Sequence, residues 1–303
     1  MIYTMTLNPS IDFIVEVADF EVGILNKIQK EAKFPGGKGI NVSQVLKRLG
    51  TDNKALGFIG GFTGDYIVDS LKQRGIVTDF VGVQEDTRIN IKLKTGQETE
   101  INGQGPTIQE PELTALLNKI DALTTNDVLV LAGSIPQSLP VTIYETLASI
   151  ATKKGAKVVA DTTGEVLLNV LPNKPFLIKP NHHELGELFD VKIETVEEAV
   201  PYGKRLVEMG AQHVIVSMAG AGALLFSKDG ALYANVPKGV LKNSVGAGDS
   251  VVAGFLSNYF RTGDVQQAFK YGVASGSATA FSPELCTQQE VEELLPQIKL
   301  TTM

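Results

Sequence analysis

Short runs of β-branched and aliphatic residues alternate along the chain with longer stretches in which apolar residues recur every three to four positions. The short runs predict strands buried on both faces, and the longer stretches predict helices. This alternation predicts a mainly parallel sheet flanked by helices. The expected strands are Lys54–Phe58, Asp127–Leu131, Lys157–Ala160, Phe176–Lys179 and His213–Ser217. The expected helices are Val42–Leu49, Gly64–Arg74, Glu110–Ile120, Val141–Thr152 and Thr195–Met209.

Two helix starts carry the capping-box pattern, in which a threonine is followed three residues later by a glutamate. The pairs are Thr195 with Glu198, and Thr287 with Glu290. In this pattern each side chain accepts a hydrogen bond from the backbone of the other residue. We therefore expect helices to begin after Thr195 and after Thr287.

Two regions break the rhythm of strand and helix. Ile11–Lys33 and Arg88–Asn102 have the alternating, glycine-punctuated character of antiparallel strands. Together they predict a small β-sheet, which is either a lid over a site or a structural extension. The chain has no internal repeat, low-complexity tract or proline-rich linker. We therefore expect one domain over residues 1–303, with a lid formed by about residues 11–33 and 88–102.

Composition narrows the classes of function. A formal charge of −7 argues against a general nucleic-acid binder, which needs a basic face. The one cysteine, Cys286, cannot form an internal disulfide, and the N-terminus lacks a secretory signal pattern. No apolar run approaches the roughly 20 residues that cross a bilayer. These features predict a cytoplasmic protein without membrane or nucleic-acid partners.

The most informative segment is Asn243–Ser250, which reads NSVGAGDS and precedes an apolar run. It predicts a turn that enters a buried helix. Amides of Gly246, Ala247 and Gly248, with the positive end of the helix dipole, would hold an anion there. Asp249 could accept a proton from a hydroxyl that attacks a bound phosphate. The segment alone leaves open whether Asp249 is such a base or only caps the helix.

A second glycine-rich turn, Pro35–Asn41, precedes another helix. Its small residues would let a hydroxyl-rich ligand lie against the backbone, with Lys38 and Asn41 as polar contacts, although glycines of this kind more often form a purely structural turn. Asp12 follows the first expected strand. Asp12 could bind sugar hydroxyls through hydrogen bonds or serve as a turn residue.

Two further segments follow expected strands. Asn181 suits a helix N-cap, and Glu184 could hold a water of hydrated Mg²⁺ or act as a helix-start carboxylate. Ser217–Ala223 could lie under a nucleotide or form a tight turn. Common phosphate-loop, dinucleotide and hydrolase motifs are absent from the sequence.

In combination these segments resemble the signatures of the ribokinase-like carbohydrate kinases. The signatures are Gly36–Asn41, Lys179–Glu184 and Val245–Ser250. The resemblance runs from Thr6–Ser10 through Leu131–Pro136 to the C-terminal helices. It implies a central sheet flanked by helices, a β lid that closes over the sugar, and a homodimer through lid contacts. Segments Asp86–Asn90 and Glu100–Pro106, with the histidine pair after Asn181, are most similar to the branch of the family that acts on fructose 1-phosphate.

The resemblance also implies a role for individual residues. It implies Asp249 as the base, with Gly246, Ala247 and Gly248 as the anion hole. It implies sugar contacts from Asp12, Gly36, Gly37, Lys38 and Asn41. It implies contacts to the sugar phosphate from Arg88, Ser134 and Lys27, the last of which could equally be a solvated lid lysine. It implies ATP contacts from Lys179, Asn181, Ser217, Met218, Ala219, Gly220, Ala221, Gly222 and Gly248. It implies Glu184 as the residue that holds Mg²⁺, through water.

The reaction so implied transfers the γ-phosphoryl group of Mg-ATP to the 6-hydroxyl of D-fructose 1-phosphate, giving D-fructose 1,6-bisphosphate. Alternatives within the family are kinases of tagatose 6-phosphate or fructose 6-phosphate. An alternative of another class is a sugar-phosphate-binding regulator without catalysis. A nicotinamide oxidoreductase is disfavoured by the missing dinucleotide motif.

Overall fold

The computed structural model describes residues 1–303, and its largest feature is a sheet of eleven strands. The strands are β1 (Ile2–Thr6), β4 (Asn53–Ile59), β5 (Val77–Thr78), β6 (Val81–Gly82), β9 (Val128–Ala132), β10 (Lys157–Asp161), β11 (Leu177–Ile178), β12 (His213–Ser217), β13 (Ala223–Ser227), β14 (Gly230–Ala234) and β15 (Leu300–Thr302). Their order is β15-β14-β13-β12-β11-β10-β9-β1-β4-β5, with β6 beside β4. Pairing is parallel from β12 through β5 and antiparallel from β12 to β15.

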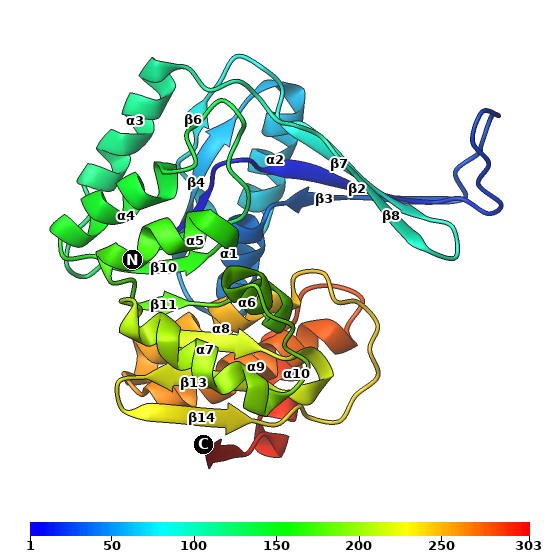
Figure 1. Cartoon of the computed structure of the whole chain (residues 1–303). Coiled ribbons are helices and arrows are strands. Elements are labelled where there is room, and N and C mark those ends of the chain that lie inside the picture. Colours follow the sequence, from blue (N-terminus) through cyan, green and yellow to red (C-terminus); the bar gives the residue numbers. More distant parts are fainter.

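Helices cover both faces of this sheet (Figure 1). One face carries α1 (Lys38–Arg48), α2 (Gly61–Gln73), α8 (Ala247–Thr262), α9 (Val265–Phe281) and α10 (Gln288–Leu294). The other carries α3 (Glu110–Asp121), α4 (Ile143–Lys153), α5 (Gly164–Val170), α6 (His182–Phe189) and α7 (Val196–Glu208). Two large apolar clusters, of 35 and 29 buried residues, fill the two interfaces between sheet and helices. None of the helices combines the length and apolar composition needed to span a bilayer.

The expected elements of the main sheet are confirmed, with shifted ends in several cases. Strand β12 has the predicted bounds, whereas β11 is shorter than predicted. Both capping boxes form, at Thr195 and at Thr287. Helix α1 begins at Lys38, four residues before the predicted start at Val42. The antiparallel extension β13–β15 was not predicted, because its short strands differ little in sequence from parallel ones.

A second, four-stranded sheet projects from the body beside α2 (Figure 1). Its strands are β2 (Ser10–Glu16), β3 (Lys30–Gly36), β7 (Arg88–Lys94) and β8 (Glu98–Asn102). The pairs β2–β3 and β7–β8 are antiparallel, as expected, but β2 and β7 join them in parallel. We call this element the small sheet.

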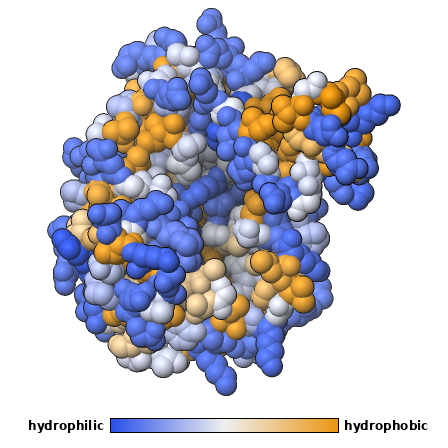
Figure 2. All heavy atoms as spheres, turned by 45° about the vertical axis from the view of Figure 1, so that its right-hand side comes forward, coloured by the Kyte–Doolittle hydropathy of each residue, from blue (hydrophilic) through white to orange (hydrophobic).

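The two faces of the small sheet differ in polarity, because its side chains alternate. Its polar face turns toward the body and includes Asp12, Asn90, Lys92, Glu100 and Asn102. Its opposite face is apolar and includes Ile11, Phe13, Val15, Ile89, Ile91, Leu93 and Ile101. Figure 2 shows apolar side chains gathered on this projecting part of the molecule.

Candidate active site

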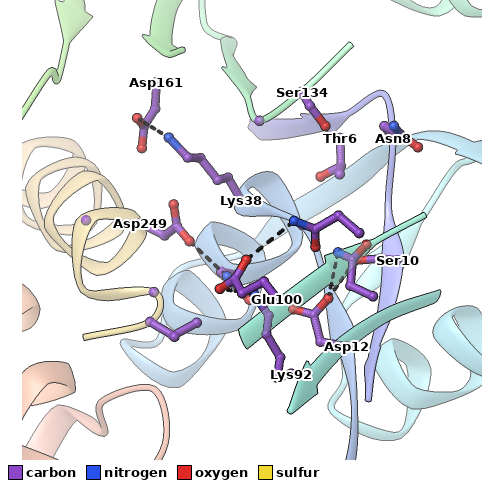
Figure 3. A pocket seen from close by; sticks show the side chains of 18 of the residues that line it. Thr6, Asn8, Ser10, Asp12, Lys38, Lys92, Glu100, Ser134, Asp161 and Asp249 are labelled. Carbon is purple, nitrogen blue, oxygen red and sulfur yellow. Dashed lines mark hydrogen bonds and ion pairs between the residues drawn. The ribbon is translucent and has the colours of Figure 1, made fainter. Parts of the chain in front are cut away.

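A cavity of about 640 Å³ lies between the carboxyl ends of the central strands, the start of α8 and the polar face of the small sheet. Parallel α/β sheets commonly bind ligands at this edge. Thirteen of the residues expected at the site line it: Asp12, Gly37, Lys38, Asn41, Arg88, Ser134, Lys179, Asn181, Glu184, Ser217, Gly246, Gly248 and Asp249. Several of these side chains point into the same space (Figure 3).

Asp249 is the third residue of α8 and only 6% exposed. Its Oδ2 accepts a hydrogen bond of 2.8 Å from Asn41 Nδ2. Burial and, to a smaller extent, the negative charge of Asp161 raise the pKa of Asp249 to about 6, against the opposing effects of Asn41, Lys38 and Lys179. The carboxylate is therefore mostly ionised at neutral pH, and its pKa is close enough to neutral pH for it to accept and release a proton during a reaction.

Backbone amides and one ammonium group converge beside Asp249. Gly246 caps α8 with φ 76°, a left-handed conformation that favours glycine, and the Ala247 amide after it donates to the Ser244 carbonyl at 3.3 Å. A Cβ placed on Gly248 would lie 3.1 Å from Lys179 Nζ. Lys179 thus stands against the helix start, where the dipole and the free amides already favour an anion.

Asp161 connects two lysines below this anion site. Its Oδ1 lies 3.1 Å from Lys38 Nζ and 3.4 Å from Lys179 Nζ. The carboxylate is 1% exposed, and its Oδ2 has no hydrogen-bond partner. Burial would raise the pKa of Asp161, but the two ammonium groups more than offset this and lower it. Asp161 therefore stays ionised and holds both lysines at the cavity wall.

Arg88 and Ser134 lie at the end of the cavity formed by the small sheet. Arg88 donates to the carbonyls of Asn8 (3.2 Å) and Gly103 (3.0 Å), and to Ser134 Oγ (3.4 Å). Burial lowers the pKa of the guanidinium, which remains charged at physiological pH. These bonds fix its position before any ligand arrives.

Asp12 is held on the same face of the small sheet. It accepts hydrogen bonds from Ser10 Oγ (2.8 Å) and Asn90 Nδ2 (3.1 Å). A Cβ on Gly36 would lie 2.4 Å from Asp12 Cγ, so only glycine leaves room for this carboxylate. Gly36 does not line the cavity itself, yet it sets the position of a residue that does.

The charges around the cavity nearly cancel. Its cations are Lys38, Arg88, Lys92 and Lys179, and its carboxylates are Asp12, Glu100, Asp161, Glu184 and Asp249. Four cations and five carboxylates give the cavity a net charge of −1. Lys92 pairs with Glu100 at 2.5 Å, and Lys38 and Lys179 share Asp161. Arg88 is the one cation of the cavity without a carboxylate partner, so it can pair with an anionic ligand without giving up an ion pair.

Asn181 and Glu184 form a reciprocal capping box at the start of α6. Asn181 Oδ1 accepts from the Glu184 amide at 2.9 Å, and Glu184 Oε2 accepts from the Asn181 amide at 2.8 Å. The cap leaves Glu184 Oε1 free beside the cavity. No group of three or more acidic, histidine or cysteine side chains could enclose a metal. This donor set fits Mg²⁺, which keeps most of its waters and binds through one or two carboxylates and substrate phosphates.

Some expected residues lie outside the cavity lining. They are Lys27, Gly36, Ala247, Met218, Ala219, Gly220, Ala221 and Gly222. Lys27 is exposed on the loop that joins β2 to β3, at the far tip of the small sheet (Figure 1). The segment from Ala219 to Ala221 forms a 3₁₀ turn after β12, next to Ser217. The roles assigned to these residues stay predictions.

Sequence reasoning missed ten residues of the lining: Thr6, Asn8, Ser10, Asn90, Lys92, Glu100, Asn102, Gly133, Asp161 and Val245. Asp161 could have been found, because it ends the apolar strand that begins at Lys157, on the edge where such proteins bind ligands. The polar residues of β7 and β8 could have been found from the alternation that predicted these strands.

Comparison with known proteins agrees with this geometry. Residues 5–291 match the pfkB family carbohydrate kinases. The chain is 59% identical to 1-phosphofructokinase of Bacillus subtilis, over the full length of both sequences. It is 45% identical to 1-phosphofructokinase of Borreliella burgdorferi, over 99% of this chain and 98% of that protein. The crystal structure of a putative phosphofructokinase from Staphylococcus aureus superposes with TM-score 0.90 at 44% identity, over 100% of this chain and 99% of that chain. This superposition confirms the expected fold class. The chain therefore belongs to the pfkB family of carbohydrate kinases.

Proposed function

We propose that this kinase transfers the γ-phosphoryl group of ATP to the 6-hydroxyl of D-fructose 1-phosphate, giving D-fructose 1,6-bisphosphate. The full-length likeness to two proteins named 1-phosphofructokinase supports the choice of sugar. The observation that carries the chemistry is the position of Asp249, a buried carboxylate beside the amides of a helix start. A base and an anion site are then adjacent, as phosphoryl transfer to an alcohol requires.

In this proposal Asp249 accepts the proton of the 6-hydroxyl as that oxygen bonds to the γ-phosphorus. The bond from the γ-phosphorus to the bridging oxygen breaks, and ADP leaves with the bonding electrons. Amides of Gly246 and Gly248 stabilise the charge on the transferred group, with Lys179 alongside. The Ala247 amide would join them by giving up its 3.3 Å hydrogen bond to the Ser244 carbonyl. Lys38 shares Asp161 with Lys179, so either lysine can turn to a phosphate while the other remains paired.

Arg88 and Ser134 would hold the 1-phosphate at the opposite end of the cavity, while Asp12 accepts hydrogen bonds from sugar hydroxyls. Bound Mg²⁺ would neutralise phosphate charge, which a cavity of net charge −1 cannot do alone. Glu184 would hold it through a water. The small sheet would act as a lid of a single kinase domain, excluding water that competes with the sugar as acceptor. A cytoplasmic location follows from the use of ATP.

The proposal is tested by a coupled assay of ADP release with Mg-ATP and a panel of phosphosugars. The panel contains fructose 1-phosphate, fructose 6-phosphate, tagatose 6-phosphate and tagatose 1-phosphate. We expect kcat/KM to be highest for fructose 1-phosphate. Higher kcat/KM with a 6-phosphate would contradict the sugar assignment, and the absence of sugar-dependent ADP release would indicate a binding protein without catalysis.

Turnover should fall in acid, because the base must be ionised. Burial raises the pKa of Asp249 to about 6. The carboxylate is ionised above this pH and takes up a proton below it. We therefore expect kcat/KM for the sugar, which reports the ionisation of the free enzyme, to be level above about pH 7 and to fall about tenfold per pH unit below pH 6. Steady-state rates at sugar concentrations well below KM, measured between pH 5 and 8 with saturating Mg-ATP, follow this limb. A profile that stays flat down to pH 5 would contradict the assignment of a base with this pKa.

Replacing Arg88 by alanine should weaken phosphosugar binding much more than ATP binding. A charge-assisted contact to a phosphate contributes about 1.5–3 kcal/mol, so KM for the sugar should rise roughly 10- to 150-fold. KM for ATP should change less than about twofold. Thermal melts check that the variant is folded, because the wild-type side chain also bonds two carbonyls. Equal rises of both KM values would argue for a structural role instead.

We also propose that two chains associate through the apolar face of the small sheet. Ile89 and Ile101 on this face are 42% and 55% exposed, although side chains of this type are usually buried. The loop at the tip adds further exposed apolar residues, among them Val22, Ile24 and Leu25. Burying such a patch against its own copy gives a symmetric dimer.

The double substitution Ile89→Asp and Ile101→Asp should convert the dimer to a monomer. It would place four carboxylates in an apolar contact, where unpaired charges are strongly disfavoured. Analytical ultracentrifugation measures the change. Val141→Asp is the matched control, because Val141 is an apolar residue of similar exposure (52%) outside the small sheet. A wild-type chain that sediments as a monomer at micromolar concentration would rule the contact out.

A further inference from the structure

A second cavity, of about 280 Å³, lies beside the catalytic one and is not used by the proposed reaction. It shares Asp12, Asn41, Lys92 and Val245 with the catalytic cavity and continues along the polar face of the small sheet to Lys94 and Glu98. Its other wall belongs to the body: α1, the end of α2, and the loops before α8 and after α9. This wall includes Arg48, Arg74, Lys242 and Leu285.

The charge of this cavity is opposite to that of the catalytic one. Its cations are Arg48, Arg74, Lys92, Lys94 and Lys242, and its carboxylates are Asp12, Glu98 and Glu284. Five cations and three carboxylates give this cavity a net charge of +2, compared with −1 for the catalytic cavity. Arg48 pairs with Glu284 at 3.2 Å, and Lys92 pairs with Glu100. Arg74, Lys94 and Lys242 form no ion pair.

The cations without a carboxylate partner come from both sides of the cavity, and of these Arg74 donates hydrogen bonds to the Ser70 carbonyl and hydroxyl. Lys94 is on the small sheet, whereas Arg74 and Lys242 are on the body. Arg48 is fixed by its contacts to the Leu285 carbonyl and Glu284. Ile14, Phe34, Pro283 and Leu285 narrow the space between them. The volume of about 280 Å³ is large enough for a small molecule with two phosphate groups but lies just below the range of about 300–1,000 Å³ that is usual for drug-sized ligands.

We infer that this second cavity binds a small polyanion without metal, such as diphosphate, and that the bound anion bridges the small sheet and the body. A nucleotide complexed with Mg²⁺ has part of its charge neutralised and suits the catalytic cavity. A cavity of net charge +2 instead favours anions that carry no metal, because their full charge remains to be compensated. The ligand class does not depend on which sugar the enzyme phosphorylates.

The test is titration calorimetry of the full-length chain with inorganic pyrophosphate, in buffer freed of divalent metal by a chelating resin. Lys94→Ala and Lys242→Ala remove one cation from each wall. Each should weaken binding by roughly threefold, and the double variant by about tenfold. The double variant Lys72→Ala and Lys238→Ala is the matched control. It removes the same charge from exposed positions on the neighbouring segments, outside this cavity, and should leave affinity within about twofold.

Four outcomes would overturn the inference. Equal weakening by the control pair would mean that the anion responds only to overall charge. Loss of binding in Arg88→Ala, with normal binding in the Lys94 and Lys242 variants, would place the anion in the catalytic cavity. Absence of measurable heat up to millimolar pyrophosphate would mean that there is no such site. An effect of one of the two lysine variants alone would contradict the bridge between the walls. Because no turnover is measured, these results are independent of the proposed reaction.

Discussion

Asp249→Asn should lower kcat by about 10²- to 10⁴-fold, the usual contribution of a general base, while ATP affinity changes little. The amide matches the carboxylate in size and can still accept the hydrogen bond from Asn41, so the surroundings should persist. It cannot take up the hydroxyl proton. The rate is measured by coupled assay and ATP affinity by calorimetry. Burial raises the pKa of Asp249 to about 6, which means that its ionised form is destabilised by folding. The variant should therefore melt no lower than the wild type.

Asp264→Asn is the matched control that separates a base from a helix cap. Asp264 caps α9, accepts hydrogen bonds from the amides of Gln266 and Gln267, and is exposed. Because asparagine caps a helix about as well as aspartate, the change removes only the charge beside the helix dipole, and it should lower stability by less than about 1 kcal/mol and leave kcat unchanged. The two aspartates should thus show opposite patterns. If Asp249→Asn also lowered only the melting temperature, Asp249 would be a cap and the proposed mechanism would be wrong.

Asp161→Asn should have the second large effect, because it leaves two lysines without their shared counter-charge. Lys179 is 5% exposed, and an unpaired ammonium that deep costs about 3–5 kcal/mol. We expect a melting temperature several degrees lower. The variant should also shift the acid limb of kcat/KM to lower pH, because Asp161 raises the pKa of Asp249 while both lysines lower it.

Two comparisons keep this second prediction specific. The phosphate of the sugar also titrates near pH 6, but Asp161→Asn cannot alter that ionisation, so a shifted limb identifies Asp249 as its source. The double variant Asp161→Asn and Lys179→Met removes the buried charge and should recover most of the lost stability. A double variant that melts as low as the single one would show that Asp161 stabilises the fold by some other contact.

Features encoded by neighbouring residues were the predictable ones. The caps at Asn181, Thr195 and Thr287 each depend on a partner three residues away, and all three form. Strand β12 was predicted to the residue because its apolar run has clear limits. The start of α1 was placed too late, because glycines at helix starts read as turn residues although here they allow close contact with β1.

Features that depend on distant pairs were not predictable. Asp161 lies 123 residues from Lys38, and its importance appears only when the fold brings them within 3.1 Å. The same holds for the polarity of the small sheet. Alternation predicted strands, but only the parallel pairing of β2 with β7 shows that their polar sides face one cavity. Lys27 lies on the loop between β2 and β3, and the sequence of this loop does not indicate whether it turns toward the site or away from it.

The parallel pairing of β2 with β7 has a consequence for biosynthesis. The hairpin β2–β3 is complete at Gly36, yet the strand that covers its open edge begins only at Arg88, about 50 residues later. At roughly 5–20 residues per second the ribosome needs about 3–10 s to supply it. During that interval a two-stranded hairpin, too small to be stable alone, presents Ile11, Phe13 and Val15 and an unpaired edge to other nascent chains. Until β7 is synthesised, this hairpin is therefore exposed to edge-to-edge association with other chains.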